Sequence, residues 1–185
     1  MLTEEEYKTE LYKIISKYPK KYRGAKYIRN WDRFWAEKKQ IIDLCNLTNV
    51  KTALDIGTGI GMLPYQLMQK GITVEGTDID EDTTGTMFIE ACKLINLTRY
   101  ELFVNPNKTL NLPKHYDLIL STRTEFDRQQ GFDWNYFITD AFNYCNQLFI
   151  KTNIGGLINP FPDTIIPFSF KIAQWSFYIK KEDWQ

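Results

Sequence analysis

Residues 53–61 read Ala53-Leu54-Asp55-Ile56-Gly57-Thr58-Gly59-Ile60-Gly61, an apolar run with an acid near its end, followed by three alternate glycines. The apolar part predicts a short buried strand over Thr52–Ile56, and the pattern after the glycines predicts a helix over Met62–Lys70. Glycines at a strand-to-helix turn let a ligand approach the backbone, and the start of a helix offers unpaired N–H donors. The stretch therefore predicts a nucleotide-binding loop.

The chain after this loop continues to alternate between strand and helix patterns. Period-two alternation from Phe168 to Ile179 predicts one or two closing strands at a sheet edge. This order indicates an α/β fold with a mostly parallel central sheet, helices on both faces and an antiparallel C-terminal edge. The other expected strands are Ile72–Thr77, Tyr100–Val104, Tyr116–Ser121 and Gln147–Thr152, and the expected helices run from about Asp82 to Ile95 and over Asn135–Cys145.

An N-terminal helical segment is expected before the loop. Thr3 and Glu6 have the spacing of a capping box, and Pro19 is expected to end the first helix. Asn30 is the candidate cap of a second helix, whose apolar stripe extends from Trp31 to Cys45. A length of 185 residues suits a single domain, with residues 1–48 as a helical cap and residues 51–185 as the α/β core.

Composition narrows the class of partner. The chain has 23 Lys and Arg against 23 Asp and Glu, whereas proteins that bind nucleic acid through its phosphates usually carry a basic excess. The three cysteines lack zinc-site spacing, and Cys45 and Cys92 fall in helical apolar patterns, so we expect reduced core cysteines, no metal site and a cytoplasmic protein. The acidic N-terminus and the lack of a run of about 18 apolar residues argue against a signal peptide and a membrane span.

Residues around the glycines discriminate between nucleotide ligands. A dinucleotide fingerprint G-x-G-x-x-G would place glycine at position 62, where Met62 stands. Asp55 would repel a pyrophosphate, but its carboxylate suits a cationic ammonium group. Asp78, at the end of the next expected strand, is placed to hold two ribose hydroxyls, as acids at this point do in nucleotide-binding sheets. An ammonium group at one end and a ribose at the other describe S-adenosylmethionine.

These residues resemble the motifs of class I S-adenosylmethionine-dependent methyltransferases, which have a Rossmann-like fold. Residues 53–61 look like the first motif, Gly76-Thr77-Asp78-Ile79 resembles the second, and the resemblance covers residues 51–152. More narrowly, residues 125–140 resemble small bacterial members of unassigned substrate. The resemblance implies that Ile79 packs on adenine and that Asn105 lies near the adenine amino group. The residues expected to bind the cofactor are Asp55, Gly57, Thr58, Gly59, Gly61, Asp78, Ile79, Asn105 and Ser121.

The loop after the fourth strand is the expected place for the acceptor, because ligands bind outside the carboxyl ends of such strands. Glu125 is the candidate catalytic base there, needed only if the acceptor loses a proton, and a solvated charged loop is the alternative. His115 precedes this strand and is interpreted as a surface residue. The resemblance places N-terminal helices over the cofactor, which makes Tyr22, Tyr27 or Trp31 candidate lid contacts, although Trp31 has core spacing.

Methyl transfer to a small molecule by in-line displacement is the function that these features favour. No Asn/Asp-Pro-Pro-aromatic element follows the fourth strand, and the net charge is +0, so nucleic acid is disfavoured as the acceptor. Three alternatives stay open. They are a non-catalytic module that binds S-adenosylmethionine or its demethylated product, a protein or RNA methyltransferase that uses the basic residues 17–26, and a nicotinamide-dependent oxidoreductase.

Overall fold

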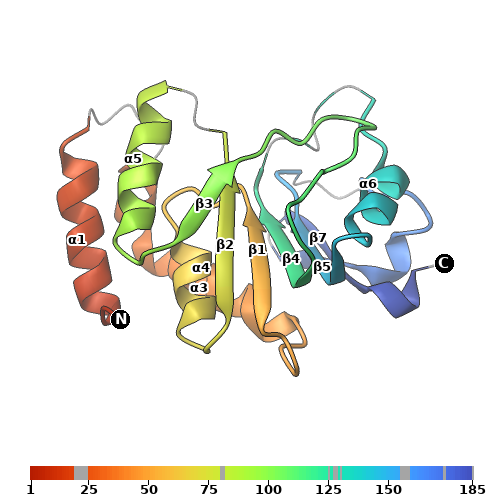
Figure 1. Ribbon diagram of the computed structural model, residues 1–185, viewed down its shortest axis with the longest axis horizontal. Coiled ribbons are helices and arrows are strands. Elements are labelled where there is room, and N and C mark those ends of the chain that lie inside the picture. The colour runs from red at the N-terminus through yellow and green to blue at the C-terminus, as the bar shows by residue number, and fades with distance from the viewer. Residues whose placement is uncertain are drawn as a thin grey trace.

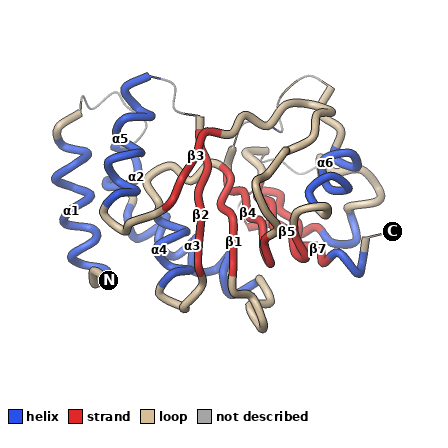
Figure 2. The backbone as a smooth tube through the Cα atoms, viewed as in Figure 1, coloured by secondary structure: helices blue, strands red, loops and turns tan. Residues whose placement is uncertain are grey.

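The computed structural model describes residues 1–18, 25–79, 82–124, 126, 129, 131–154, 159–172 and 174–184. Within them, seven strands form one sheet in the order β3-β2-β1-β4-β5-β7-β6 (Figures 1 and 2). The strands are β1 (Thr52–Ile56), β2 (Thr73–Asp78), β3 (Thr98–Glu101), β4 (Tyr116–Thr122), β5 (Cys145–Lys151), β6 (Ser169–Ile172) and β7 (Gln174–Lys180). The helices are α1 (Glu4–Ser16), α2 (Ala25–Arg29), α3 (Trp31–Leu44), α4 (Met62–Met68), α5 (Asp82–Lys93) and α6 (Trp134–Ala141), with short 3₁₀ turns at Ile166–Phe168 and Lys181–Asp183.

Pairing within the sheet confirms the expected α/β fold. Strands β1 to β5 pair in parallel, and β7 runs antiparallel to both β5 and β6. Strand β1 pairs with β2 on one side and with β4 on the other, so the order of strands reverses between β1 and β4. Ligands of open parallel sheets bind outside the carboxyl ends of the strands at such a reversal. The glycine loop, which follows β1, lies at this point.

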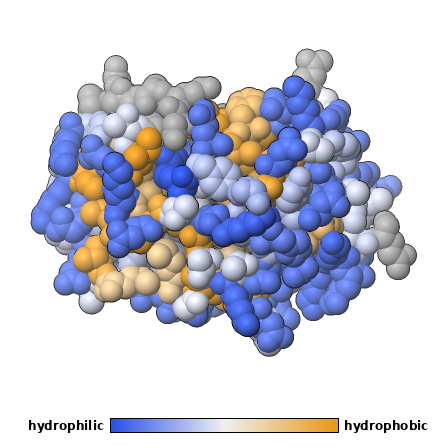
Figure 3. Space-filling view, viewed as in Figure 1, coloured by the Kyte–Doolittle hydropathy of each residue, from blue (hydrophilic) through white to orange (hydrophobic). Residues whose placement is uncertain are grey.

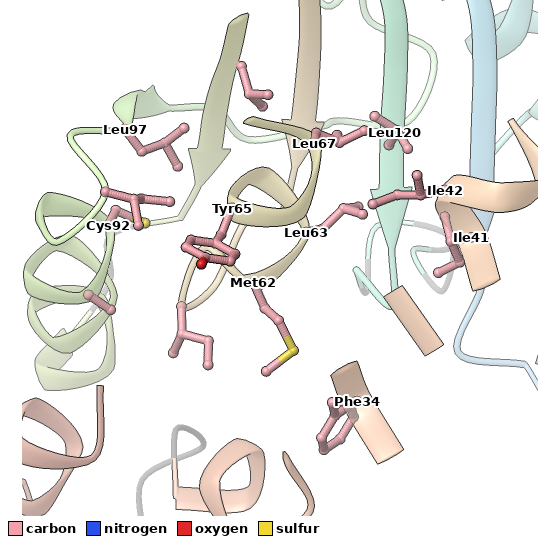
Figure 4. Close-up of a cluster of buried hydrophobic side chains, with 14 of the residues drawn as sticks. Phe34, Ile41, Ile42, Met62, Leu63, Tyr65, Leu67, Cys92, Leu97 and Leu120 are labelled. Carbon is pink, nitrogen blue, oxygen red and sulfur yellow. The ribbon is translucent and has the colours of Figure 1, made fainter. Parts of the chain in front are cut away.

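Successive residues of the central strands face two separate apolar cores. Leu118 and Leu120 of β4 pack with side chains of α1, α3, α4 and α5, whereas Ile119 packs with those of α6 on the other face. Figure 4 shows part of the first core, where Leu120 lies beside side chains of α3 and α4. Both faces of the sheet are therefore covered, as a parallel sheet requires.

The face under α6 is covered partly by irregular chain. Residues 102–115, which connect β3 to β4, contain no helix. Leu110 and Leu112 of this connection are buried in the same core as α6. The connection is also tied to the helix, because Leu110 N donates to Asp140 Oδ2 at 2.7 Å.

The N-terminal segment contains one helix more than the sequence indicates. Helix α1 begins with the expected capping box, in which the Thr3 side chain accepts from Glu6 N and the Glu6 carboxylate accepts from Thr3 N. Asn30 is the N-cap residue of the next long helix, as expected, and its carbonyl accepts from Phe34 N, but its side chain does not cap the helix. The Asn30 Nδ2 instead donates to Lys26 O of α2 at 3.0 Å. Because the short helix α2 ends directly before Asn30, the Asn30 side chain forms a hydrogen bond with a carbonyl group of α2.

Several element boundaries differ from the expected ones by one or more residues, and the two largest differences are at the ends of β3 and α6. The strand expected over Tyr100–Val104 begins earlier, as β3, and ends at Glu101, because only these residues pair with β2. The helix expected over Asn135–Cys145 ends at Ala141, because Cys145 already pairs with β4 in the parallel ladder. In both places an apolar pattern continues beyond the element, and the hydrogen-bonded ladder decides where the element ends.

Exposure of the remaining residues follows the sequence expectations. Cys45, Cys92 and Cys145 are buried and form no disulfide with one another, and His115 is exposed before β4. None of the described helices is both long and apolar enough to cross a membrane. Hydrophilic residues make up most of the face shown in Figure 3, with apolar residues in smaller patches between them.

Candidate functional site

The glycine loop, residues 57–61, is a tight turn fixed to the neighbouring strand. Gly57 N and Thr58 N both donate to Thr77 O of β2 at 2.8 Å. Gly57, Gly59 and Gly61 have φ values of 78°, 56° and 81°, a left-handed conformation that glycine adopts most readily. The alternate glycines are therefore required by the backbone itself.

The loop also packs too closely on its neighbours for larger residues. A Cβ at Gly57 would lie 1.9 Å from Thr124 Cγ2 in the loop after β4. A Cβ at Gly76 of β2 would lie 2.4 Å from Thr58 Oγ1. The Thr58 hydroxyl donates to Asp55 O at 2.8 Å. Thr58, which was expected to bind the cofactor, thus packs between β1 and β2 with its hydroxyl engaged inside the protein.

Two helices hold the loop through its carbonyl groups. The Tyr7 hydroxyl of α1 donates to Ile60 O at 2.8 Å, and Cys92 Sγ of α5 donates to Gly59 O at 3.5 Å. Burial raises the pKa of Tyr7 well above its usual range, so the hydroxyl stays a donor. Its ring stacks on Tyr65 of α4 with centroids 4.3 Å apart, and Figure 4 shows Tyr65 and Cys92 in this core. The loop is thus preorganised by α1 and α5.

Asp55, the next-to-last residue of β1, is buried with an unused oxygen. It is 2% exposed, and its Oδ1 has no hydrogen-bond partner among the described residues. Burial raises the pKa of Asp55 to about 7, an effect that Lys38 opposes and Asp78 reinforces. A buried carboxylate with an unpaired oxygen gains most from a cationic partner.

Asp78, the last residue of β2, holds the opposite side of the glycine loop. Its Oδ2 accepts from Gly59 N at 2.7 Å, and its Oδ1 accepts from Ile79 N at 2.9 Å. The residue is half-buried, at the carboxyl edge of the sheet. The two acids of the expected site therefore lie at adjacent strand ends, on either side of the strand-to-helix turn.

Tyr27 of α2 lies against the loop. The side chain is half-buried, and its hydroxyl oxygen would be 3.6 Å from a Cβ at Gly59. Burial raises the pKa of Tyr27 to about 12, and the nearby carboxylate of Asp78 adds to the shift. Of the other two candidate lid residues, Trp31 is 4% exposed and belongs to the core, and Tyr22 lies outside the described residues.

The expected adenine contacts follow β2 and β3. Ile79 directly follows β2 and is 36% exposed. Asn105 lies four residues after the end of β3, and its Nδ2 donates to Phe103 O at 3.3 Å. Phe103 itself is 51% exposed at the same edge. Sequence reasoning missed Phe103 as a surface apolar group because it was counted within the third strand, whose observed end is Glu101.

Of the two candidate site residues at the carboxyl end of β4, the structure describes Ser121 but not Glu125. Ser121 is fully buried in β4, where its hydroxyl donates to Ile56 O at 3.1 Å and shares a 2.6 Å hydrogen bond with Thr124 Oγ1. Its hydroxyl therefore ties the loop after β4 to β1. Glu125, the candidate base, lies outside the described residues. Within the described part of the chain, no three His, Cys, Asp or Glu side chains gather as a metal site.

Sequence reasoning also missed a group of four buried or half-buried charges, Glu37, Lys38, Arg123 and Lys151, called here the charged cluster. Glu37 Oε2 lies 2.5 Å from Arg123 Nη2 and 3.3 Å from Lys151 Nζ. Lys38 Nζ donates to Thr122 Oγ1 at 2.5 Å. Burial lowers the pKa of Lys38 to about 8, although neighbouring acids oppose this shift. The cluster joins α3 to the carboxyl ends of β4 and β5.

The sequence contains a signal for this cluster. Glu37 and Lys38 follow Phe34 by three and four residues and therefore share the apolar face of α3. Lys151 follows the run Leu-Phe-Ile within a strand that was expected to be buried. Charged residues are almost never fully buried unless they are paired, so their presence at core positions indicates an ion pair or a site.

Comparison with known proteins places the fold. No protein-family model and no curated protein matches the chain. Among solved structures, PigF with SAH aligns at a TM-score of 0.59 and 14% identity, over 92% of this chain and 62% of that chain. The mitomycin 7-O-methyltransferase MmcR aligns at 0.53 and 17% identity, over 82% and 44%. TrmK of M. capricolum, in complex with S-adenosyl-homocysteine, aligns at 0.52 and 14% identity, over 80% and 69%.

At these identities the similarity concerns the fold. The chain spans less than two thirds of the length of PigF and less than half that of MmcR. The observed strand order, the antiparallel β7 and the glycine loop after β1 agree with this similarity. The protein therefore has the Rossmann-like fold of the class I S-adenosylmethionine-dependent methyltransferases.

Proposed function

We propose that the protein binds S-adenosylmethionine at the glycine loop and transfers its methyl group to a small-molecule acceptor. The observation that carries the proposal is the position of two acids at the loop. Asp55 is buried with an unpaired Oδ1, and Asp78 faces the loop from the end of β2. The solved structures of PigF and TrmK, which share the fold, contain SAH.

The residues present fit this cofactor. The orphaned Oδ1 of Asp55 would accept a hydrogen bond from the methionine ammonium group, which relieves a buried carboxylate without a partner. The Asp78 carboxylate would accept from the ribose hydroxyls, in addition to or in exchange for Gly59 N. Ile79 and Phe103, both exposed at this edge, would offer apolar surface to the adenine ring.

Catalysis in this proposal depends on alignment. When bound, the cofactor would supply a methyl group on a cationic sulfur, and this sulfur would be the leaving group when the acceptor takes the methyl group in line. The loop, held by Tyr7 and Cys92, would fix the position of the cofactor before the reaction, and such positioning lowers the barrier substantially. Tyr27, packed against the loop, would help to exclude water.

We also propose that residues 1–48 form a helical cap on the domain core of residues 51–185.

Binding and turnover test the proposed function. In isothermal calorimetry we expect S-adenosylhomocysteine to bind and NAD not to bind. With labelled S-adenosylmethionine and a cell extract, we expect the methyl label in the small-molecule fraction. Binding of NAD without S-adenosylhomocysteine would indicate an oxidoreductase instead. Binding without any methyl transfer would indicate a non-catalytic module, and label in protein or RNA would indicate a macromolecular acceptor.

The affinity for S-adenosylhomocysteine is expected to depend on pH through Asp55. Burial raises the pKa of Asp55 to about 7, so in acid the group is protonated and cannot pair with an ammonium cation. A bound ammonium favours the carboxylate, so binding releases a proton. Between pH 5.5 and pH 7 we expect affinity to rise by about tenfold. Calorimetry in buffers of different ionisation enthalpy measures both effects.

The control for this prediction is Asp55→Asn, which keeps the shape but cannot ionise. The variant should bind more weakly and with little dependence on pH over the same range. Circular dichroism at each pH checks that both proteins stay folded. An unchanged pH profile in the variant would show that the titrating group is a different one.

A further inference from the structure

The charged cluster lies on the acceptor side of the proposed cofactor. Lys151 ends β5 and Arg123 directly follows β4, whereas Asp78 ends β2 on the other side of β1. If Asp78 holds the ribose and Asp55 the ammonium group, the cofactor runs from β2 towards β4. Its reactive methyl group then lies at the β4 side of the loop, where the charged cluster is.

Charge within this group is not balanced by its described members. Two acids act on Lys38, Glu37 more strongly than Asp55, so the three cations of the cluster face two carboxylates. Glu37 is the single acid that pairs with both Arg123 and Lys151 among the described residues. One positive charge is therefore left over. Because charge is expensive to bury without a counter-charge, such a surplus favours the binding of an anion.

Several polar atoms of the cluster are also unused. Arg123 Nε is buried and makes no hydrogen bond to the described residues, and Lys151 Nζ contacts Glu37 Oε2 only as an ion pair at 3.3 Å. Glu37 Oε1 is also buried without a hydrogen-bond partner among these residues. The side chain of Lys151 is 0% exposed, whereas that of Arg123 is 20% exposed. Arg123 can therefore contact a ligand directly, while Lys151 acts from beneath through its charge.

Arg123 is held in this place by an unusual backbone conformation. Its φ of 61° is in the left-handed region, which a residue with a side chain adopts at a cost. Arg123 N donates to Lys151 O at 2.8 Å, and Asn153 Nδ2 donates to Arg123 O at 2.8 Å. The guanidinium also lies over the ring of Phe34, 5.4 Å from its centroid. These contacts therefore fix the orientation of the Arg123 side chain.

We propose that the charged cluster binds an anionic group, a carboxylate or a phosphate, on the methyl acceptor, with Arg123 in direct contact and Lys151 as the buried charge behind it. The inference rests on the proposed function, because it needs the cofactor at the glycine loop. It names the acceptor class as an acidic molecule. Glu37 then partly neutralises Arg123 and Lys151, which stabilises the folded protein when no acceptor is bound.

The test uses the full chain saturated with S-adenosylhomocysteine, so that the cofactor's own carboxylate is already in place before any anion is added. Sodium benzoate, inorganic phosphate and neutral benzamide are titrated by calorimetry at constant ionic strength. We expect at least one anion to bind about tenfold more tightly than benzamide. Tighter binding of benzoate than phosphate assigns a carboxylate, and the reverse order assigns a phosphate.

Four variants locate the binding. Arg123→Met and Lys151→Met should each weaken the anion by about tenfold or more. Glu37→Gln should strengthen it several-fold, since the competing carboxylate is removed. Lys114→Met is the matched control, because Lys114 is a cation paired with Glu75 at 2.6 Å outside the cluster. If Lys151→Met fails to fold, Arg123→Met and Glu37→Gln still decide the question.

Three results would overturn the inference while leaving the cofactor site intact. In the first, neither anion binds more tightly than benzamide. In the second, all variants bind the anion equally, as a diffuse surface effect would require. In the third, Arg123→Met and Lys151→Met lose S-adenosylhomocysteine as well, which would assign the cations to the cofactor carboxylate. A wild-type protein that does not bind S-adenosylhomocysteine would instead refute the proposed function before any anion is added.

Discussion

Replacing Gly57 with alanine is expected to destabilise the protein by roughly 2–5 kcal/mol and to abolish binding of S-adenosylhomocysteine. The left-handed φ of 78° disfavours any side chain, and the new Cβ would meet Thr124 Cγ2 at 1.9 Å. Thr124 cannot turn away without losing its 2.6 Å hydrogen bond to Ser121. Urea denaturation measures the loss of stability, and calorimetry measures the loss of binding.

Gly71→Ala is the matched control for this clash. Gly71 has a similar φ of 81°, but a Cβ there would meet nothing within 4 Å. We expect a loss of about 1 kcal/mol from backbone strain alone, with normal cofactor affinity. Adding Thr124→Ala to Gly57→Ala should recover part of the stability, because the clashing methyl group is gone. Equal losses at Gly57 and Gly71 would contradict the steric argument.

Asp78→Asn is expected to weaken the binding of S-adenosylhomocysteine by roughly 10-fold to 100-fold. A hydrogen bond to a charged group contributes about 1.5–3 kcal/mol, and the amide retains the shape of the side chain but not its charge. The carboxylate also accepts from Gly59 N at 2.7 Å, so the variant loosens the middle of the loop. Calorimetric titration of the ligand against both proteins gives the change directly.

Asp117→Asn separates this effect from a general loss of stability. The Asp117 carboxylate accepts from Lys51 N and Thr52 N at 2.8 and 2.9 Å, near the amino end of β1. We expect this variant to unfold at lower urea concentration while it binds S-adenosylhomocysteine normally. An Asp78→Asn protein with wild-type affinity would remove Asp78 from the ribose site.

Most secondary structure could be predicted because its signals are local. The apolar run of Thr52–Ile56 and the capping box of Thr3 and Glu6 are found where the sequence places them. Element ends were less predictable. The apolar residues after Glu101 have the pattern of a continuing strand, but the strand ends at Glu101 and Val104 is buried in the core under α6. Pairing with a neighbouring strand sets these limits, and a single sequence does not contain the partner's register.

The candidate site divides in the same way. The glycine loop and the two acids are recognisable because each follows a strand within a few residues, and the carboxyl ends of parallel strands meet at one edge. The neighbours that support the loop come from distant parts of the chain. Tyr7 lies 53 residues before Ile60, its hydrogen-bond partner, and Thr124 was not linked to Gly57 by any pattern.

The amino-acid sequence alone was sufficient for the α/β class, the glycine loop and the positions of Asp55 and Asp78, since period and spacing are properties of neighbouring residues. Only the tertiary structure brought Glu37 of α3 against Arg123 and Lys151, because their pairing depends on how a helix docks on the sheet. Burial and charge balance are properties of that packing. The expected donor site was therefore readable from the chain, while the charged cluster beside it became visible only in the folded protein.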